Sequence, residues 1–482
     1  MGNSRLTKPL PAMKILLGFL LNMLLWLMTL PVWAQSGEKL YKTYCAGCHG
    51  EQLQGSSAPA LIKNSWKHGG DKSSLIKTIT QGVPTTEMIK WENTLNTKEI
   101  ESIADFIVNA QQKPKKERQY EESFMVETKH YKLKVERLVT SGLNTPWGIE
   151  FVDHNTALIS EKSGELTWMK NGKLSDSSVK NTPLTYAQSI LGGYMDIALD
   201  RDYAKNGWVY LALSHNSENS LDAKAAGMTK IVRGKIRENQ WHEEQTLFQV
   251  HDSLQVKGGT RWGSRLALDK KGHLFFTIGD MNRGEDSQIL TRPSGKIFRI
   301  NTDGSIPKDN PLAGNGQFLQ AIYSWGNRNA QGITIHPQTN SIYATEHGPK
   351  GGDELNIIKN GANYGWPLVT YGVDYSGKII SDKSEKEGIE KPLTQWTPSI
   401  AVSAIDFAFS PKFSKWKGNL IVGSLAFQEL RRLLIEGDKV LEQEILLKGY
   451  GRIRDVKFAP DGALYLLMNA PDQVLKITPM NE

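Results

Sequence analysis

The sequence predicts a small all-α domain followed by an all-β domain with the fold of a six-bladed propeller. Residues 35–112 show the spacing of amphipathic helices. Residues 113–130 begin with the charged, Pro-containing run KPKKERQYEE, which is typical of a linker. Residues 131–482 alternate short apolar, β-branched and aromatic runs with Gly, Asn and Asp turns, as strands and hairpins do.

The number of blades comes from a weak repeat in the β-rich part. An apolar segment that leads into a turn and a second strand recurs six times, starting near Trp147, Met195, Arg265, Gly332, Ala404 and Asp455. Such regular recurrence favours radial symmetry over a pair of sandwiches. We therefore expect six blades of four strands, with the core between neighbouring blades and the loops of one end forming a mouth for a ligand.

Residues 1–34 have the pattern of an export signal. A basic start from Arg5 to Lys14 precedes an apolar run from Ile15 to Leu30, and Val32-Trp33-Ala34 offers a cleavage site. The run has about 16 residues, whereas a bilayer span needs about 20, so an uncleaved N-terminal anchor is the alternative. Removing 1–34 takes away three positive charges and lowers the net charge from +7 to +4. This mild excess forms no clustered basic stripe, which argues against a nucleic-acid partner.

The segment Cys45-Ala46-Gly47-Cys48-His49 is the attachment pattern of a c-type haem. The thiols of Cys45 and Cys48 form thioethers with the haem, and His49 is placed to take one axial position of the iron. A redox-active Cys-x-x-Cys is the alternative, but it does not require the following histidine. These are the only two cysteines of the chain. We expect covalent haem c and a periplasmic location, because haem c is attached after export.

Two helices are expected in the haem domain, with the second axial ligand coming from the segment between them. Leu40, Tyr41 and Tyr44 share one face of a helix that leads into the motif, and residues 100–107 carry an apolar stripe after possible N-caps at Asn96 and Thr97. The segment from Gly82 to Met88 resembles the sulfur-ligand loop of small class I cytochromes c. We expect Met88 as the second axial ligand, with His68 as its rival.

A group of motifs in the β-rich part carries a family resemblance. They are Tyr323-Ser324-Trp325-Gly326-Asn327-Arg328-Asn329-Ala330-Gln331-Gly332, Glu346-His347-Gly348-Pro349, Gly352-Asp353-Glu354-Leu355-Asn356, Asn363-Tyr364-Gly365-Trp366-Pro367 and Arg452-Ile453-Arg454-Asp455. In this order they resemble the soluble PQQ-dependent aldose sugar dehydrogenases, the glucose/sorbosone dehydrogenase family. The similarity runs from about residue 141 to 478. It implies a six-bladed propeller whose mouth holds pyrroloquinoline quinone (PQQ) on a calcium ion.

The resemblance also assigns residues to the cofactor. Arg328 and Asn329 match the pair that addresses the reactive quinone carbonyl and stabilises charge as hydride arrives. Arg452 and Arg454, one residue apart, should point the same way from a strand as a fork for carboxylates.

Two calcium sites are implied as well. The backbone oxygens of Gly348 and Pro349 match the ligands of the cofactor's calcium. Glu354 and the carbonyl of Tyr364 match a second, structural calcium site.

Three positions depart from the family. Arg261 stands where a histidine acts as general base, and an arginine cannot be deprotonated in a protein. The aspartate that supports this base is kept as Asp280, so we expect an ion pair between Asp280 and Arg261. Leu191 replaces a substrate-contacting glutamine, and Ala426 replaces a lysine that meets a PQQ carboxylate.

Two functions remain open. In one, the propeller oxidises a sugar or another alcohol and reduces its own haem, with Asp280 or His251 as substitute base. A downstream acceptor of the respiratory chain would then take the electrons. In the other, the propeller has lost catalysis and binds a ligand or partner beside an electron-transfer haem. Membrane contact is expected only through an uncleaved N-terminus.

Overall fold

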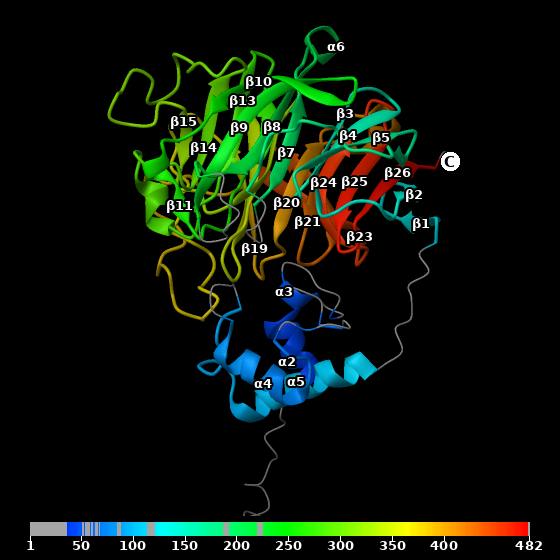
Figure 1. Cartoon of the computed structure of the whole chain (residues 1–482), viewed down its shortest axis with the longest axis vertical. Coiled ribbons are helices and arrows are strands. Elements are labelled where there is room, and N and C mark those ends of the chain that lie inside the picture. Colours follow the sequence, from blue (N-terminus) through cyan, green and yellow to red (C-terminus); the bar gives the residue numbers. More distant parts are fainter. Residues whose placement is uncertain are drawn as a thin grey trace, which may run out of the picture.

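The computed structural model describes residues 36–50, 53, 58, 61–62, 66, 68–83, 88–112, 121–186, 192–218 and 225–480, without the side chains of Gly47 and Cys48. The predicted export signal, residue Leu191 and residues 84–87 of the ligand loop lie outside these ranges. The chain forms a helical domain (residues 36–112) and a six-bladed β-propeller (Figure 1). Within the described ranges, no helix is long and apolar enough to cross a membrane.

The helical domain has the helices that the periodicity predicts. They are α2 (Gly37–Tyr44), α3 (Ala46–His49), α4 (Lys72–Gln81) and α5 (Thr97–Gln112). A capping box starts α5, because the Asn96 side chain accepts from the Glu99 N–H at 3.1 Å while the Glu99 carboxylate accepts from the Asn96 N–H at 2.9 Å. Gly37 lets α2 cross α5 closely, since a Cβ there would lie 2.0 Å from the Ser102 oxygen. The apolar stripes of both helices meet in one core.

The propeller consists of six antiparallel sheets. The strands, in blade order and counted from the axis outward, are β3 (Pro146–Phe151), β4 (Thr156–Glu161), β5 (Glu165–Lys170) and β6 (Lys173–Leu174); β7 (Tyr194–Leu199), β8 (Trp208–His215), β9 (Ala226–Arg237) and β10 (Gln240–Phe248), with β11 (Val256–Lys257) also paired to β9; β12 (Leu266–Leu268), β13 (His273–Ile278), β14 (Lys296–Asn301) and β15 (Ile322–Trp325). They continue with β16 (Ala330–Ile335), β17 (Ile342–Glu346), β18 (Asp353–Ile358) and β19 (Thr394–Trp396); β20 (Val402–Phe407), β21 (Leu420–Ser424), β22 (Glu429–Glu436) and β23 (Lys439–Lys448); and β24 (Arg452–Phe458), β25 (Leu464–Asn469), β26 (Gln473–Pro479), β2 (Lys132–Val139) and β1 (Ser123–Glu127). Short helical turns join some of them, namely α6 (Tyr203–Asn206), η1 (Asp252–Leu254), η2 (Gly284–Gln288) and η3 (Pro411–Trp416).

The predicted repeat corresponds to the inner strand of each blade. The inner strands β3, β7, β12, β16, β20 and β24 contact one another in a closed ring. Each of the six predicted motif starts lies in one of these strands or directly before it. Separate apolar clusters fill the six spaces between neighbouring blades. The expectation of a core between blades is therefore confirmed, and hydrophobic burial holds the ring together.

One predicted boundary needs correction. Residues 113–130 were expected to form a linker, but β1 begins at Ser123 and pairs with β2 at the outer edge of the last blade. Phe124 and Val126 alternate with more exposed residues and contact the apolar cluster of that blade. Phe124 also stacks on Tyr450 with ring centroids 4.5 Å apart. The alternation covers only five residues and is flanked by charged residues, so the sequence pattern did not predict this strand.

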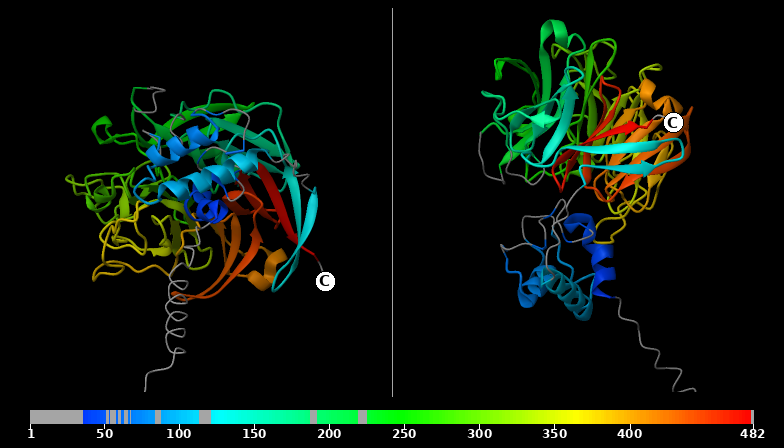
Figure 2. Two further views of the ribbon diagram at one scale, coloured as in Figure 1. Left: turned by 90° about the horizontal axis from the view of Figure 1, so that it is seen from below. Right: turned by 90° about the vertical axis from the view of Figure 1, so that its right-hand side faces the viewer.

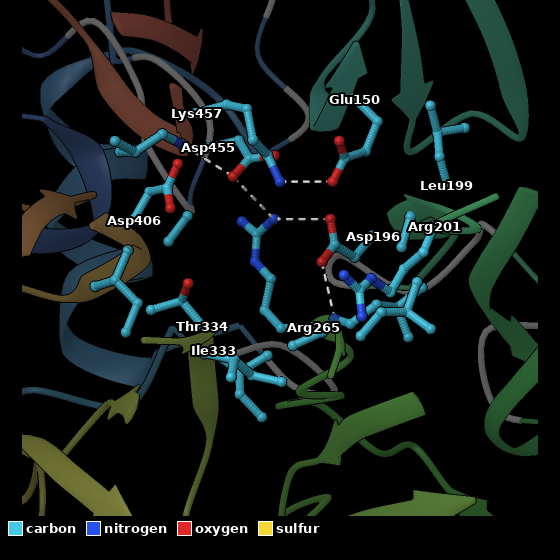
Figure 3. A pocket seen from close by; sticks show the side chains of 18 residues that line it. Glu150, Asp196, Leu199, Arg201, Arg265, Ile333, Thr334, Asp406, Asp455 and Lys457 are labelled. Carbon is cyan, nitrogen blue, oxygen red and sulfur yellow. Dashed lines mark hydrogen bonds and ion pairs between the residues drawn. The ribbon is translucent and has the colours of Figure 1, made fainter. Parts of the chain in front are cut away.

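A network of buried charges ties the inner strands along the axis (Figure 3). Arg265, directly before β12, lies 3.2 Å from Asp196 of β7 and 3.6 Å from Asp455 of β24. Its Nε donates to the Gln331 carbonyl of β16 at 2.8 Å, and its Nη2 donates to the Arg454 carbonyl. Its Nη1 also donates to the Trp147 carbonyl of β3 at 3.5 Å, so one side chain joins five blades.

A cavity of about 300 Å³ adjoins this network. Glu150 and Lys457, whose side chains pair at 2.6 Å, and Asp406 line it together with the later residues of the inner strands. It therefore lies beyond Arg265, away from the end of the axis where the inner strands begin.

The helical domain lies at the end of the propeller where the inner strands begin. Figure 1 shows α6 at the opposite end and α3 as the helix nearest to the propeller, and the right-hand view of Figure 2 agrees. One contact joins a described residue of each domain: the Lys350 amine lies 5.4 Å from the centre of the Tyr44 ring.

Candidate active site

The predicted site residues of the propeller gather at the mouth, which we define as the end of the axis where the inner strands begin. Arg328 and Asn329 directly precede β16, and the pair Gly348-Pro349 follows β17. Arg452 and Arg454 lie at the start of β24.

Arg328 is fixed against the loop that follows β17. Its Nη1 donates to the Gly348 carbonyl at 2.6 Å and to the His347 carbonyl at 3.3 Å, and its guanidinium lies 5.3 Å from the centre of the Trp366 ring. Its Nε is buried and has no hydrogen-bond partner among the described residues. Arg328 therefore has a donor left for a ligand.

The loop after β17 is itself held by Asp353. This carboxylate accepts from the Gly348 N–H at 2.9 Å, from the Ser399 hydroxyl at 2.6 Å and from the Val402 N–H at 3.1 Å. Because Asp353 is fully buried, these bonds make the position of Gly348 rigid.

Asn329 is held beside Arg328 by the neighbouring blade. Its Oδ1 accepts from the Gly263 N–H at 3.1 Å. Gly279 allows this approach, because a Cβ there would lie 1.9 Å from the Arg261 oxygen and 2.8 Å from Asn329 Oδ1. Any other residue would push the segment at Arg261 away from Asn329.

The predicted fork of Arg452 and Arg454 has a different geometry. The pairing of β24 with β25 shifts between Ile453 and Asp455, so a bulge at Arg454 breaks the alternation of side chains. Arg454 donates to Asn469 at 2.7 Å and lies 4.3 Å over the ring of Trp147, in the next blade. Arg452 instead donates to the Leu425 carbonyl of the preceding blade, at 3.4 Å. The two arginines reach to opposite sides of β24.

Several buried arginines gather at the mouth. Neither Arg328 nor Arg454 forms a salt bridge with a described residue, although both are buried. Burial, together with the charges of Arg452 and Arg265, lowers the pKa of Arg454 well below its usual value. A buried cation without a counter-charge is unfavourable, so the site fits an anionic ligand. The carboxylates of PQQ meet this requirement.

The expected ion pair between Arg261 and Asp280 is present. Arg261 Nε lies 3.1 Å from Asp280 Oδ1, and its Nη2 donates to Asn282. Asp280 is fully buried and also accepts from the Trp366 indole N–H at 2.9 Å and from the Asn282 N–H at 3.0 Å. Both carboxylate oxygens are thus engaged, which does not favour Asp280 as the substitute base.

A histidine that the sequence reasoning did not select lies at the mouth. Burial and the neighbouring Arg328 lower the pKa of His347 to about 3, so its imidazole is neutral. Its Nε2 lies 2.5 Å from the Val402 carbonyl and donates to it, which leaves Nδ1 as an acceptor. His347 stands inside the quoted motif Glu346–Pro349, which was the available signal. His251, by contrast, is exposed and caps η1 through Ser253.

A pair of buried carboxylates lies behind the mouth. Burial raises the pKa of Glu354 to about 7 and that of Glu346 well above its usual value. The amide nitrogens of Asn327 and Asn356 donate to the Glu346 carboxylate at 3.5 Å, and that of Asn356 also donates to Glu354 at 3.0 Å. Their side-chain oxygens are buried and have no partner among the described residues. Carboxylate and amide oxygens are ligands that calcium prefers, and a structural calcium site here stays a prediction. Tyr364 is buried as well, but its place in the ligand set stays a prediction.

The helical domain leaves the haem ligands as predictions. Cys45 is buried and His49 is half-buried at the end of α3. Met88 packs against the domain core, whereas His68 is exposed, which favours Met88. The Cys48 side chain lies outside the described residues.

Ala426, where the resemblance leads us to expect a lysine, directly follows Leu425, whose carbonyl accepts from Arg452.

Comparisons with known proteins match both parts of the chain. A family model described as glucose/sorbosone dehydrogenase matches residues 143–476, and one described as cytochrome c oxidase, cbb3-type, subunit III matches residues 33–107. The aldose sugar dehydrogenase YliI of Escherichia coli (strain K12) is 36% identical over 344 residues, which are 70% of this chain and 91% of that protein.

A solved structure and a cytochrome give further similarity. The PQQ-bound form of an aldose sugar dehydrogenase from Streptomyces coelicolor matches with a TM-score of 0.57 and 26% identity, over 72% of this chain and 98% of that one. A cbb3-type cytochrome c oxidase subunit CcoP of Azospirillum brasilense is 39% identical over 83 residues, which are 16% of this chain and 28% of that subunit. The chain therefore spans only a small part of the cytochrome relative.

Proposed function

Because the chain belongs to the glucose/sorbosone dehydrogenase family and also carries a cytochrome c domain, we propose that it is a periplasmic quinohaemoprotein. It oxidises a sugar or another alcohol at PQQ and passes the electrons to its own haem c. The observation that carries this proposal is the mouth, where Arg328 and Arg454 are buried without a carboxylate partner among the described residues. When bound, PQQ would accept a hydride from the substrate carbon and then release the electrons singly.

The protein supplies binding and charge for this reaction. Arg328 keeps its Nε for the cofactor while its Nη1 is held by Gly348, so it can stabilise negative charge without moving. Arg454 and Arg452 would receive carboxylates on either side of β24. The carbonyls of Gly348 and Pro349 would hold the cofactor's calcium, and Glu354 with Tyr364 a structural one.

The proton of the substrate hydroxyl needs a base other than Arg261. His347 lies at the mouth with a neutral imidazole whose Nδ1 can accept a hydrogen bond, but its pKa of about 3 makes it a weak base, so we do not assign the proton to it. Asp280 is engaged at both oxygens and holds Arg261 in place. Without a strong base among the described residues of the mouth, aldose turnover should be slow.

The test follows the haem after the cofactor is supplied. The full chain is titrated with PQQ and calcium in a calorimeter, aldoses are added, and the absorbance of reduced haem is recorded. We expect calcium-dependent binding and haem reduction that requires both PQQ and the aldose. Absence of PQQ binding in the presence of calcium would end the quinoprotein proposal.

A second function is favoured by one observation, the replacement of the family base by Arg261 in an ion pair with Asp280. In that case the propeller binds a ligand or partner and the haem transfers electrons independently. PQQ binding without haem reduction by any aldose or alcohol would support this alternative. In either case we propose that a downstream acceptor of the respiratory chain takes electrons from the haem.

A further inference from the structure

We propose that the helical domain docks on the propeller rim at Lys350, with Tyr44 as its anchor and the haem motif turned toward the mouth. The partner is therefore the chain's own helical domain. The proposal rests on the proposed function for its purpose, but the docking itself can be measured without turnover.

The first observation is the contact between Lys350 and Tyr44, whose amine and ring centre are 5.4 Å apart. Lys350 is exposed on the propeller rim, and Tyr44 packs edge-on against Trp91 within the helical domain, at 5.6 Å. The Tyr44 ring is thus held by its own domain and presents a face to the amine. Such a cation–π contact is attractive and sensitive to the sign of the charge.

The second observation is where this contact falls in both domains. Tyr44 directly precedes Cys45, the first residue of the haem motif. Lys350 directly follows Pro349, and the Gly348 carbonyl before it accepts from Arg328. The contact therefore lies between the haem attachment site and the residue assigned to the quinone. In Figure 1 and Figure 2, α3 is accordingly the helix nearest to the propeller.

The third observation is how the rim holds Lys350. Its backbone forms two hydrogen bonds with Val373, of 2.9 and 3.3 Å, which fix the position from which its amine reaches Tyr44.

The contact is weak, which suits a domain that must leave again. A single exposed cation–π pair changes an equilibrium by about two- to fivefold. The tether supplies the rest, because it holds the two surfaces at a millimolar effective concentration. The docked and released forms should both be populated, so substrate can reach the mouth in the released form and electrons can cross in the docked form.

The experiment compares Lys350→Glu with Lys205→Glu in the full haem-loaded chain. Lys205 lies in α6 at the other end of the propeller, so this control changes the net charge equally (Figure 1). Small-angle scattering without PQQ should show a larger radius of gyration for Lys350→Glu than for the parent and for Lys205→Glu. Equal radii for the two variants would overturn the docking proposal, whatever the catalytic result.

A second measurement tests the pair itself. After PQQ, calcium and aldose are supplied, the rate of haem reduction should fall about two- to fivefold in Lys350→Ala and in Tyr44→Leu. The double variant should be no slower than the slower single variant, because the two residues act through one contact. Independent, multiplying effects would contradict the proposal. Reduction of a small phenazine dye should be unchanged in Lys350→Ala; if the parent does not reduce the dye, the proposed function fails while the scattering test still stands.

Discussion

Two groups of buried arginine lie along the axis of the propeller, and only one of them has carboxylate partners. Arg265 is 3% exposed and lies between Asp196 and Asp455. Arg328 and Arg454 are each 6% exposed, yet neither forms a salt bridge with a described residue. Their burial is nearly equal, so the difference between them is the direct ion pair.

This difference separates a structural role from a binding role. A buried ion pair such as that of Arg265 is complete within the folded chain, and removal of one partner leaves an unpaired charge in the interior. Arg328 and Arg454 are incomplete without an anion from outside. Arg261 stands between these cases, because it pairs with Asp280 but keeps a side chain that is 20% exposed.

The largest effect on stability should come from breaking the ion pairs of Arg265 with Asp196 and Asp455. Arg265→Met leaves Asp196 and Asp455 buried without their cation, and we expect the free energy of unfolding to fall by about 3–5 kcal/mol. Urea unfolding of the full chain, followed by the circular dichroism of the strands, measures this. The control is Arg237→Met, an exposed arginine paired with Glu243, which should change stability by less than about 1 kcal/mol. A similarly small change for Arg265→Met would show that its buried ion pairs do not stabilise the fold, and the contrast with Arg328 and Arg454 would be lost.

Replacing an arginine of the other group, Arg328 or Arg454, should weaken PQQ binding without lowering stability. Arg454→Met removes a cation that lacks a carboxylate, so the free energy of unfolding should stay the same or rise. PQQ binding in a calorimeter should weaken about 10- to 100-fold, because a hydrogen bond to a charged group contributes about 1.5–3 kcal/mol. If Arg454→Met destabilises the fold as much as Arg265→Met, both arginines are structural.

The intermediate arginine offers a test in the opposite direction. Arg261→His places an imidazole beside Asp280, which could orient it as it now orients the guanidinium. A positioned general base contributes about 10²–10⁴-fold, and we expect a partial gain of about tenfold in aldose turnover. Leu191 would still lack the substrate hydrogen bond of the family glutamine. Rapid aldose oxidation by the parent would show that another residue already does this work.

The smallest effect concerns the carboxylate pair behind the mouth and its pH dependence. The pKa of Glu354 is raised from 4.5 to about 7 in the folded chain. Between these values the folded state holds more protons than the unfolded state, so the stability of the calcium-free protein should fall as pH rises from about 4.5 to 7. Calcium has to displace the proton, so its affinity should weaken by up to about tenfold per pH unit below 7.

Thermal unfolding with and without calcium at pH 6 and pH 8 checks this. The stabilisation by calcium should be larger at pH 8, and Glu354→Gln should reduce it at both values. An equal stabilisation at the two pH values would mean that Glu354 does not hold the metal.

The sequence predicts the ring of blades and much of the mouth. Each inner strand is short, apolar and followed by a turn, and this local pattern marks all six blades without knowledge of their pairing. The ion pair of Arg261 and Asp280 was predictable because the resemblance assigns both residues to one dyad.

Other features depend on contacts that a sequence pattern does not contain. The bulge at Arg454 arises from the register of β24 against β25, so the alternation rule gave the wrong direction for one side chain. His347 is neutral because burial and Arg328 act together, which no local motif reveals. The strand β1 pairs with β2, and β2 joins the last blade only through the C-terminal strand β26. This long-range pairing is not visible in the local sequence around β1.

That last blade sets the order in which the molecule can be completed. Leu133 of β2 pairs with Pro479 of β26, so the first and last parts of the propeller close the ring together. Contacts between such distant positions are formed late and slowly, because the chain between them must be brought together first. The described core residues of the helical domain all lie between Leu40 and Ala110, close together in the sequence. Haem attachment can therefore be finished while the propeller is still open, and a chain that ends before β26 would carry haem on a propeller without its closing strand.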